Sequence, residues 1–416
     1  MLTIYKALSV IAFPIIEVWL IFRVLKGKEN KISFSQRFAK TNHIRPDADI
    51  IWVHAVSVGE VNSAFTLIDE IFKQDKNISI VLTTTTLTSA QIVESKLENY
   101  QNRLIHQFLP ADLLYVVRSF LEFWQFKKAI FVESEIWPNF INESHKLGIE
   151  IYLVNARISQ KSFEFWIFLQ KFLFCKIFDK FKKIFVQNEG DIKKFEQLKA
   201  KEVLFLGDLK SQSNPLSFDE KKLKKLKSAT KNRKIFLAAS THKNEEEVIL
   251  DCHQKLKTKF PNLLTIIVPR HPNRSSEISK LLTGFRFAIR SKNQKIDINK
   301  DIYLVDSIGE LGLFYKLADF AFIGGSLAKI GGHNPYEAIK LDCAVVSGHN
   351  FFNFNNIYQN LENNYGCFIA KSNSELLEIV ENLLTDQNLL NQSLKNAQKI
   401  IKNSNISQKI VKNLQI

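Results

Sequence analysis

Two sets of short apolar runs, each alternating with helical patterns, constrain the fold of this chain more than any other feature. The first set lies between residues 51 and 206, and the second between residues 235 and 346. The predicted strands are Ile51–Val56, Ile78–Thr85, Ile130–Glu133, Ile151–Val154, Ile184–Gln187, Val203–Leu206, Ile235–Ala239, Leu264–Val268, Ile302–Val305, Phe320–Ile323 and Ala344–Val346. Strands that alternate with helices form parallel sheets covered by helices on both faces. We therefore predict an α/β protein with two doubly wound, Rossmann-like domains facing a cleft, and ligands at the carboxyl ends of the strands.

We place the domain boundaries where the alternation of strands and helices is interrupted. Residues 1–30 form an apolar and then basic N-terminal segment, and residues 31–210 form the first domain. Residues 211–233 are rich in lysine and contain an Asn-Pro pair, which indicates a linker. Residues 234–400 form the second domain, and residues 401–416 form a C-terminal helix for which packing back on the first domain is one possibility.

The segment from Ala7 to Phe22 is apolar except for Ser9 and Glu17, and lysines follow it. It is shorter than the roughly 20 residues that a spanning helix needs, and the lysines are typical of the cytoplasmic flank of an anchor. We predict a short or interfacial membrane anchor; the alternative is an ordinary helix packed on the protein body. Residues 163–185 combine phenylalanines with lysines, which favours either a helix lying on an anionic bilayer or a buried helix ending in a lysine cluster.

Charge and cysteine usage narrow the function classes. The formal net charge of +15 predicts an anionic partner, which can be nucleic acid, an acidic membrane or a phosphorylated substrate. Nucleic acid is disfavoured because the chain has no recognisable single-strand or RNA-binding motif. The four cysteines are far apart, so neither a disulfide framework nor a zinc site is indicated, and a reducing compartment fits. The sequence also lacks the motifs of P-loop NTPases and of α/β-hydrolases.

The stretch from Phe322 to Lys340, F-I-G-G-S-L-A-K-I-G-G-H-N-P-Y-E-A-I-K, is the leading candidate for a ligand-binding loop. Its two glycine pairs allow close approach of the backbone. Asn334 followed by Pro335 predicts a helix start whose N–H groups face an anion. Glu337, one turn later, could accept from ribose hydroxyls. The alternative is a tight strand-to-helix turn without a ligand, and the spacing alone leaves both open.

Carboxylates follow two strands of the first set. Glu60 lies in a first helical turn, where the helix dipole is expected to keep it ionised as a general base; the alternative is a capping role with Ser57. Glu133 and Glu135 are two residues apart in extended chain, so we predict that they point the same way into the cleft. Other polar groups that follow strands of this set are Asn155, Arg157, Asp208 and Lys210.

Polar residues follow the strands of the second set as well. The two arginines of Pro269–Arg274 suit bidentate binding of phosphate. Helix starts with hydroxyl side chains occur at Thr241–Glu245 and Ser307–Glu310. His242 and His271 are candidate metal ligands, but no HExxH motif or tight His/Cys cluster supports that role. We therefore favour core or hydrogen-bonding histidines.

These segments together resemble the 3-deoxy-D-manno-octulosonic acid (Kdo) transferase family. The motifs, in chain order, are H-A-V-S-V-G-E, E-S-E-I-W-P-N, L-V-N-A-R-I-S, G-D-L-K, A-S-T-H-K-N-E-E, V-P-R-H-P-N-R, S-I-G-E-L and G-G-S-L-A-K-I-G-G-H-N-P-Y-E-A. They agree with the family in order and over nearly the whole chain, including the apolar N-terminus. The resemblance implies a GT-B glycosyltransferase fold, with the acceptor on the first domain and the donor CMP-Kdo on the second.

The resemblance also implies roles for individual residues. Glu60 would be the general base that deprotonates the acceptor hydroxyl, with inversion at the anomeric carbon, and Glu133 and Lys210 would stabilise the transition state. The residues implied to bind CMP are Pro269, Arg270, Ile308, Gly309, Glu310, Asn334, Pro335, Tyr336 and Glu337. Neither a metal nor a cofactor is expected.

The implied acceptor is a lipid A precursor, lipid IVA, and the implied process is biosynthesis of the lipopolysaccharide core. The implied location is the cytoplasmic side of a bacterial inner membrane, whose lipids are expected partners while nucleic acid is not. One segment departs from the family, which usually shows G-P-H-x-F-N-F where Gly348–Phe354 reads G-H-N-F-F-N-F. Two other hypotheses stay open: a GT-B enzyme acting on another sugar nucleotide, and a non-enzymatic basic protein that binds membranes or nucleic acid.

Overall fold

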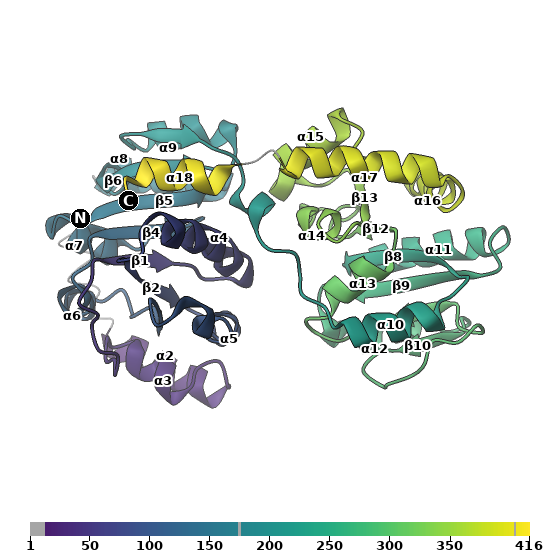
Figure 1. The fold of residues 1–416 in the computed structure, drawn as a ribbon, viewed down its shortest axis with the longest axis horizontal. Coiled ribbons are helices and arrows are strands. Elements are labelled where there is room, and N and C mark those ends of the chain that lie inside the picture. The colour runs from purple at the N-terminus through teal and green to yellow at the C-terminus, as the bar shows by residue number, and fades with distance from the viewer. Residues whose placement is uncertain (1–12, 174–175, 403–404) are drawn as a thin grey trace. The chain divides into compact units, whose positions relative to one another are not determined.

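The computed structural model of the chain describes residues 13–173, 176–402 and 405–416. These residues form two compact units (Figure 1). The first unit runs to Asn214 and also includes the C-terminal residues from 405 onward, whereas the second unit runs from Pro215 to residue 402. Each unit is built on its own sheet of seven strands.

The sheet of the first unit has the strand order β3-β2-β1-β4-β5-β6-β7, and all neighbouring strands are parallel. Its strands are β1 (Ile50–His54), β2 (Ser79–Thr84), β3 (Leu104–Phe108), β4 (Lys128–Val132), β5 (Glu150–Ala156), β6 (Phe181–Val186) and β7 (Val203–Phe205). The strand order switches direction between β1 and β4. Ligands of open α/β sheets bind beside the carboxyl ends of the strands at such a switch point, which is where Glu60 and Glu133 follow β1 and β4.

Helices pack against both faces of this sheet and thereby bury its central strands on both sides. They are α2 (Phe13–Leu25), α3 (Lys31–Gln36), α4 (Val58–Gln74), α5 (Leu87–Glu94), α6 (Leu114–Trp124), α7 (Pro138–Lys146), α8 (Gln160–Leu173), α9 (Ile192–Gln197) and α18 (Ile406–Leu414). One core layer includes Trp52 and Phe131, and the other includes Val53 and Ile410. Since Ile410 lies in α18, the C-terminal helix contributes to the core of the first unit.

The sheet of the second unit has the order β10-β11-β9-β8-β12-β13-β14, again with all neighbouring strands parallel. Its strands are β8 (Lys234–Thr241), β9 (Leu263–Pro269), β10 (Phe287–Ile289), β11 (Ile302–Leu304), β12 (Phe320–Ile323), β13 (Ala344–Gly348) and β14 (Cys367–Ala370). The order switches direction between β8 and β12. The glycine-rich stretch after β12 therefore begins at the switch point of this unit.

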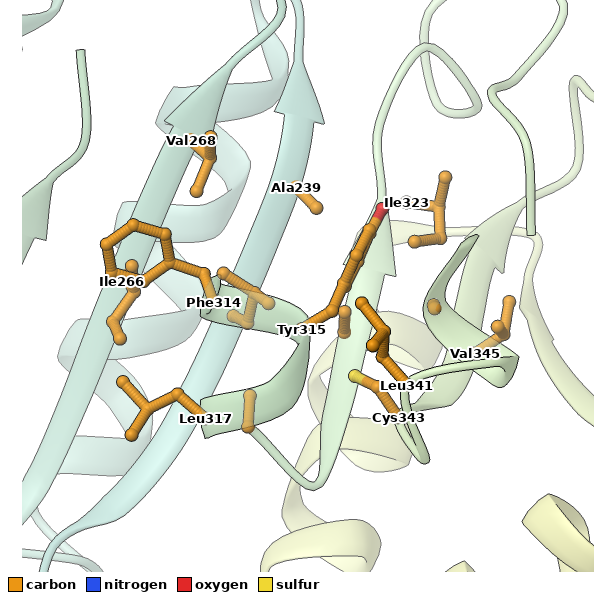
Figure 2. Close-up of a cluster of buried hydrophobic side chains, with 14 of the residues drawn as sticks. Ala239, Ile266, Val268, Phe314, Tyr315, Leu317, Ile323, Leu341, Cys343 and Val345 are labelled. Atoms are coloured by element: carbon orange, nitrogen blue, oxygen red, sulfur yellow. The ribbon is translucent and has the colours of Figure 1, made fainter. Parts of the chain in front are cut away.

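Helices also cover both faces of the second sheet. They are α10 (Glu220–Ala229), α11 (Glu245–Lys257), α12 (Ser275–Leu281), α13 (Leu311–Leu317), α14 (Tyr336–Ile339), α15 (Asn355–Asn363), α16 (Asn373–Thr385) and α17 (Gln387–Lys402). Figure 2 shows one of its core layers, in which Tyr315 reaches from α13 toward Ile323 and Phe314 faces Ile266 of β9. This layer fixes the carboxyl end of β12, from which the glycine-rich stretch starts.

Three strands, β3, β10 and β14, lie outside the predicted runs. The sequence of β3 is L-I-H-Q-F, and its polar residues His106 and Gln107 are buried with partners from other elements. His106 is hydrogen-bonded to the Thr84 hydroxyl at 2.9 Å, and Gln107 accepts from the indole N–H of Trp124 at 3.0 Å. These partners are not visible in the local pattern. The strands β10 and β14 have only three and four residues, too few for a periodic signal.

The segment 211–233, predicted to be a linker, contains the helix α10. Asp219 caps this helix by accepting from the N–H groups of Lys221 and Lys222 at 2.8 and 3.0 Å. Leu223 and Leu226, one turn apart, are buried in the core of the second unit. The linker prediction does not hold for these residues, because two leucines at helical spacing suffice to bury one face of a lysine-rich helix.

The aromatic stretch 163–185 divides between two elements. The helix α8 ends at Leu173, and β6 begins at Phe181, which is buried in the core. The prediction of one helix through this stretch, up to the predicted strand at Ile184, is therefore wrong. Within α8, Phe165 and Phe168 remain 56% and 52% exposed. Membrane contact of this helix stays a prediction.

The N-terminal segment is described from Phe13 onward, and residues 7–12 of the predicted anchor lie outside the described residues. In α2, Leu20 is buried. Apolar side chains of this helix that are exposed are Ile15, Val18, Trp19, Ile21, Phe22 and Leu25. Over the described part of the chain, no helix combines the length and the apolar character needed to cross a bilayer.

Candidate active site

Glu60 lies in the first turn of α4, directly after the carboxyl end of β1. Ser57 is the N-cap of this helix, and its hydroxyl oxygen accepts from the Glu60 N–H at 3.2 Å. The Glu60 carboxylate in turn accepts from the Ser57 hydroxyl at 2.9 Å and from the Val56 N–H at 2.8 Å. The predicted capping contact between Ser57 and Glu60 is therefore confirmed. It also fixes the carboxylate at the edge of the sheet where ligands bind.

The expectation that the helix dipole holds Glu60 ionised does not match its pKa. Burial raises the pKa of Glu60 to about 7, and the nearby charge of Glu133 raises it as well, against the two hydrogen bonds that lower it. The residue is only 8% exposed, so the loss of hydration outweighs the stabilising groups at the helix N-terminus. A carboxyl group with this pKa is about half ionised at neutral pH, which suits proton transfer.

Glu133 and Lys210 form a buried ion pair close to Glu60. Glu133 Oε1 lies 2.5 Å from Lys210 Nζ, and the two side chains are 10% and 13% exposed. Burial works to lower the pKa of Lys210, but the charges of Glu133 and Asp208 outweigh it and the pKa is raised. Lys210 therefore stays a cation. Its side chain would lie 4.0 Å from a Cβ atom at Gly59, so it packs against the start of α4 beside Glu60.

The chain turns sharply at Glu133, which has a φ of +65°. The prediction that Glu133 and Glu135 point the same way assumed an extended chain, which this turn interrupts, and the two side chains have different partners. Glu135 accepts from the indole N–H of Trp137 at 2.8 Å and lies 3.5 Å from His54 Nε2. Both carboxylates are nevertheless close enough to Glu60 for their charge to raise its pKa. Backbone strain of this kind clusters at active sites.

Asn155 and Asp208 support the turn that carries Lys210. Asn155 Oδ1 accepts from the Leu209 N–H at 2.8 Å, and Asp208 Oδ1 accepts from the Lys210 N–H at 3.0 Å. Burial raises the pKa of Asp208. The positive charge of Arg157 also acts on Lys210 and opposes the rise of its pKa. The polar groups predicted from the strand ends of the first unit are thus brought together around Lys210.

The residues implied to bind CMP lie in the second unit, after strands that are near one another in the sheet. Pro269 ends β9 and Arg270 follows it, Ile308–Glu310 follow β11, and Asn334–Glu337 follow the glycine-rich stretch after β12. The strands β11, β9, β8 and β12 are consecutive and parallel, so their carboxyl ends lie along one edge of the sheet. The three segments therefore share that edge.

Some side chains of these segments are exposed to solvent, whereas another is already paired with side chains of the protein. Arg270 is exposed, and Ile308 is 85% exposed. The Glu310 carboxylate is already bound by Arg290 at 2.7 Å and by Lys222 at 2.9 Å. The hydrogen bond from Arg290 lowers the pKa of Glu310 to about 2. Glu310 is therefore ionised, and its oxygen atoms are committed to these two cations.

The helix predicted to begin near Asn334 is the short α14, which starts at Tyr336. Pro335 is the N-cap residue of this helix, whereas the prediction placed it at the first helical position. Asn334 Oδ1 accepts from the Tyr336 N–H at 3.0 Å, and Asn334 Nδ2 donates to Glu337 Oε1 at 3.3 Å. The Asn334 side chain thus makes the capping contact expected of it and also touches the carboxylate that was expected to meet a ribose.

The first glycine pair does not leave its N–H groups open to a ligand. The N–H groups of Gly325, Ser326 and Leu327 donate to the Glu245 carboxylate at 2.7, 3.0 and 2.9 Å. Glu245 is the first residue of α11 and is 1% exposed. The N–H groups at this part of the loop are therefore satisfied by a side chain of the protein itself, whereas the predicted anion concerned the N–H groups of the helix start near Asn334. The only signal of Glu245 in the sequence is its position at a helix start after β8.

Histidines gather at the same edge of the second unit. His242 Nε2 and His333 Nε2 lie 2.8 Å apart with stacked rings, and the ring of His271 is 5.9 Å from that of His242. Burial lowers the pKa of His333 to about 4 and also lowers that of His242. His242 is thus a hydrogen-bonding histidine, as predicted. Among the residues that the structure describes, no group of three or more His, Cys, Asp or Glu side chains could hold a metal ion.

The segment that departs from the family pattern, Gly348–Phe354, supports the glycine-rich loop. Asn350 donates from its backbone N–H to the Ser326 carbonyl at 2.9 Å and from Nδ2 to the Leu327 carbonyl at 3.1 Å. Asn353 donates in the same two ways, to the carbonyls of Gly331 and residue 330, both at 3.0 Å. The two asparagines of this segment therefore stabilise the glycine-rich loop by donating to its backbone carbonyls.

Comparison with known proteins bears on the whole chain. Residues 32–213 match the family described as 3-Deoxy-D-manno-octulosonic-acid transferase (kdotransferase). The 3-deoxy-D-manno-octulosonic acid transferase of Rickettsia bellii is 36% identical over 400 residues, which cover 96% of this chain and 94% of the relative. The chain belongs to the Kdo transferase family. It is therefore an enzyme of the glycosyltransferase class, and the resemblance inferred from the motifs is confirmed.

A second relative agrees with this assignment, and a solved structure shares the fold. The Kdo transferase of Haemophilus influenzae is 34% identical over 390 residues, covering 92% of this chain and 90% of that protein. The structure of UDP-GlcNAc 2-epimerase from Neisseria meningitidis, bound to UDP-GlcNAc, matches with a TM-score of 0.59 at 12% identity and covers 88% of this chain and 99% of that one. At this identity the match shows the fold alone. The predicted GT-B class of this Kdo transferase is thereby confirmed.

Proposed function

We propose that this Kdo transferase moves Kdo from CMP-Kdo to a lipid A precursor, lipid IVA, with inversion at the anomeric carbon and Glu60 as the general base. The observation that carries the proposal is a carboxyl group with a pKa of about 7 at the switch point of the first sheet. It lies beside the buried pair of Glu133 and Lys210. A pKa near the working pH is what a general base requires.

In the proposed step, the ionised Glu60 carboxylate removes the proton from an acceptor hydroxyl. The hydroxyl oxygen forms a bond to the anomeric carbon of Kdo while the bond from that carbon to the phosphate oxygen of CMP breaks. The bonding electron pair leaves with CMP, and the proton stays on Glu60. Because the acceptor oxygen enters opposite the departing CMP, the configuration inverts. The step balances in this form without a metal ion or a redox cofactor.

The pair of Glu133 and Lys210 serves the same step in two ways. The negative charge of Glu133 contributes to the raised pKa of Glu60 and so makes Glu60 a stronger base. Lys210 offers a fixed cation for negative charge that develops in the transition state. A charge held in place before the reaction costs no reorganisation when the barrier is crossed. Burial of the pair supports this role, because it fixes both side chains.

The second unit would bind the CMP part of the donor. Arg270 is exposed at the carboxyl end of β9, and a guanidinium group suits a phosphate oxygen pair. Asn334 and Glu337 offer amide and carboxylate groups for the polar atoms of the nucleoside. The common edge of β9, β11 and β12 supports this assignment, since nucleotides bind at the carboxyl ends of such strands.

We further propose that α2 holds the enzyme in the interface of the cytoplasmic face of the inner membrane. Val18 and Leu25 are 66% and 80% exposed. The guanidinium of Arg23 lies over the ring of Trp19, at 4.8 Å from its centroid. Exposed apolar groups beside cations suit the interfacial region of an anionic bilayer.

Incubation of the enzyme with CMP-Kdo and lipid IVA, followed by mass spectrometry of the lipid, tests the proposal. The lipid mass is expected to rise by one or more Kdo residues, and the Glu60→Gln variant serves as the inactive control. Release of CMP without a change of the lipid mass would reject lipid IVA as the acceptor. No consumption of CMP-Kdo would reject the donor.

A further inference from the structure

The Glu245 carboxylate lies in a pocket of backbone N–H groups. Glu245 Oε2 accepts from the N–H groups of His242 at 2.9 Å and Gly325 at 2.7 Å. Glu245 Oε1 accepts from the N–H groups of residues 326–328 at 3.0, 2.9 and 3.4 Å. With 1% exposure, this carboxylate is removed from water and is stabilised by peptide dipoles. The arrangement is that of an anion-binding loop whose anion belongs to the protein.

The glycines of the loop pack against this carboxylate and its neighbours. A Cβ atom at Gly324 would lie 2.5 Å from the Ser240 carbonyl oxygen and 2.8 Å from Glu245 Oε2. Gly325 has a φ of +68°, and a Cβ atom there would lie 3.2 Å from the His333 ring. Both glycines are therefore required for contacts within the protein. The space that they leave open is filled by Glu245 and His333.

Hydrogen bonds within the loop connect the part bound by Glu245 to the segment that begins at Asn334. The N–H of Gly332 donates to the Gly325 carbonyl at 2.8 Å, so the two ends of the loop are tied together. The Tyr358 hydroxyl donates to the His333 carbonyl at 3.1 Å. Asn334 follows directly in the chain. The position of Asn334 thus depends on a loop that is held at its start by Glu245.

We infer that Glu245 is a positioning residue for the donor: it occupies the anion place of the glycine-rich loop and thereby sets the position of Asn334–Glu337. The inference rests on the proposed binding of CMP by the second unit. It has a direct consequence for the site. The phosphate of the donor is not held by the N–H groups of Gly325, Ser326 and Leu327, because Glu245 already takes these donors.

The Glu245→Gln variant of the full chain tests the inference. Glutamine has one acceptor oxygen, and its NH₂ group would face N–H donors that had bound a carboxylate. The donor KM is expected to rise on the order of tenfold to a hundredfold, as misplacement of binding groups does. The acceptor KM is expected to stay at the wild-type value. Amide hydrogen exchange at Gly325–Leu327 is expected to become faster.

Glu247→Gln is the matched control, because Glu247 lies in the same helical turn but is exposed. It is expected to leave both KM values and the exchange of the loop amides unchanged. If Glu245→Gln fails to fold, Glu245→Asp keeps the charge on a shorter stem and gives the same comparison. A folded variant with an unchanged donor KM would overturn the inference, as would an equal rise of the acceptor KM.

The proposed function can fail separately. If the wild-type enzyme neither binds CMP nor uses CMP-Kdo, the proposed donor is wrong. The exchange of the loop amides in Glu245→Gln still decides whether Glu245 holds the loop. Exchange at the wild-type rate in that variant would overturn the positioning role whatever the donor is.

Discussion

Replacing Glu60 by glutamine is expected to stabilise the folded protein at pH 8 while removing most of the transfer activity. The glutamine has nearly the same shape, and its oxygen can still accept from the Val56 N–H. Its NH₂ group can donate to the Ser57 hydroxyl oxygen. The change therefore removes the charge of the side chain and leaves the packing at the start of α4 in place.

The expected gain in stability follows from the pKa of Glu60, which rises from 4.5 to about 7 on folding. Because the folded state holds this proton more tightly than the unfolded state, the wild type loses stability as the pH rises from about 4.5 to about 7. The loss amounts to about 3 kcal/mol and is complete above that range. Glutamine avoids it but weakens one hydrogen bond at a cost of about 1 kcal/mol, which leaves a net gain of about 2 kcal/mol at pH 8.

Urea denaturation of both proteins at pH 5 and pH 8 measures this gain, which should be larger at pH 8. Turnover should fall by about 10²- to 10⁴-fold, the usual contribution of a general base. Glu98→Gln, at an exposed position of the same unit, controls for loss of a surface charge and should change neither quantity. The reasoning is refuted if Glu60→Gln turns over at a near wild-type rate, or if it is destabilised more at pH 8 than at pH 5.

Three further predictions concern other parts of the molecule. Lys210→Met leaves the Glu133 carboxylate buried without its cation and should lower the free energy of unfolding by about 3 kcal/mol or more, measured by urea denaturation; unchanged stability would show that the pair does not form. Arg270→Ala should weaken CMP binding roughly tenfold in calorimetry without a change in melting temperature, since the side chain is exposed, and CMP but not UDP should raise the melting temperature of the wild type. An equal response to UDP would favour another sugar nucleotide. Val18→Asp with Trp19→Ser should reduce binding to anionic vesicles at least roughly tenfold with catalysis in detergent unchanged, and undiminished binding would count against α2 as the membrane contact.

The fold was predictable because parallel strands buried on both faces appear in a sequence as nearly continuous apolar runs. β1 and β12 are of this kind. The strand β3 was not predictable in this way, because its buried His106 and Gln107 form hydrogen bonds with side chains from other elements. The helix α10 was not predictable either, because two leucines among many lysines do not distinguish a helix from a linker in the sequence.

The candidate site was predictable to the level of residue types at strand ends. The switch point in the strand order then brings Glu60 close to Glu133. The pKa of Glu60 was not predictable, because burial acts against the helix N-terminus and its extent depends on tertiary packing. Glu245 was missed for the same reason: its partners at Gly325–Leu327 are some 80 residues away in the chain. Local sequence could show a loop able to bind an anion, but not which anion binds.

The pH dependence of kcat/KM, which reports the ionisation of the free enzyme, tests most directly the claim that Glu60 takes the proton from the acceptor. The account predicts that kcat/KM of the wild type rises about tenfold per pH unit below about pH 7 and is level above it. The residual activity of Glu60→Gln should lack this rise. A wild-type profile that is flat from pH 5 to pH 9, or the same rise in the variant, would contradict the claim.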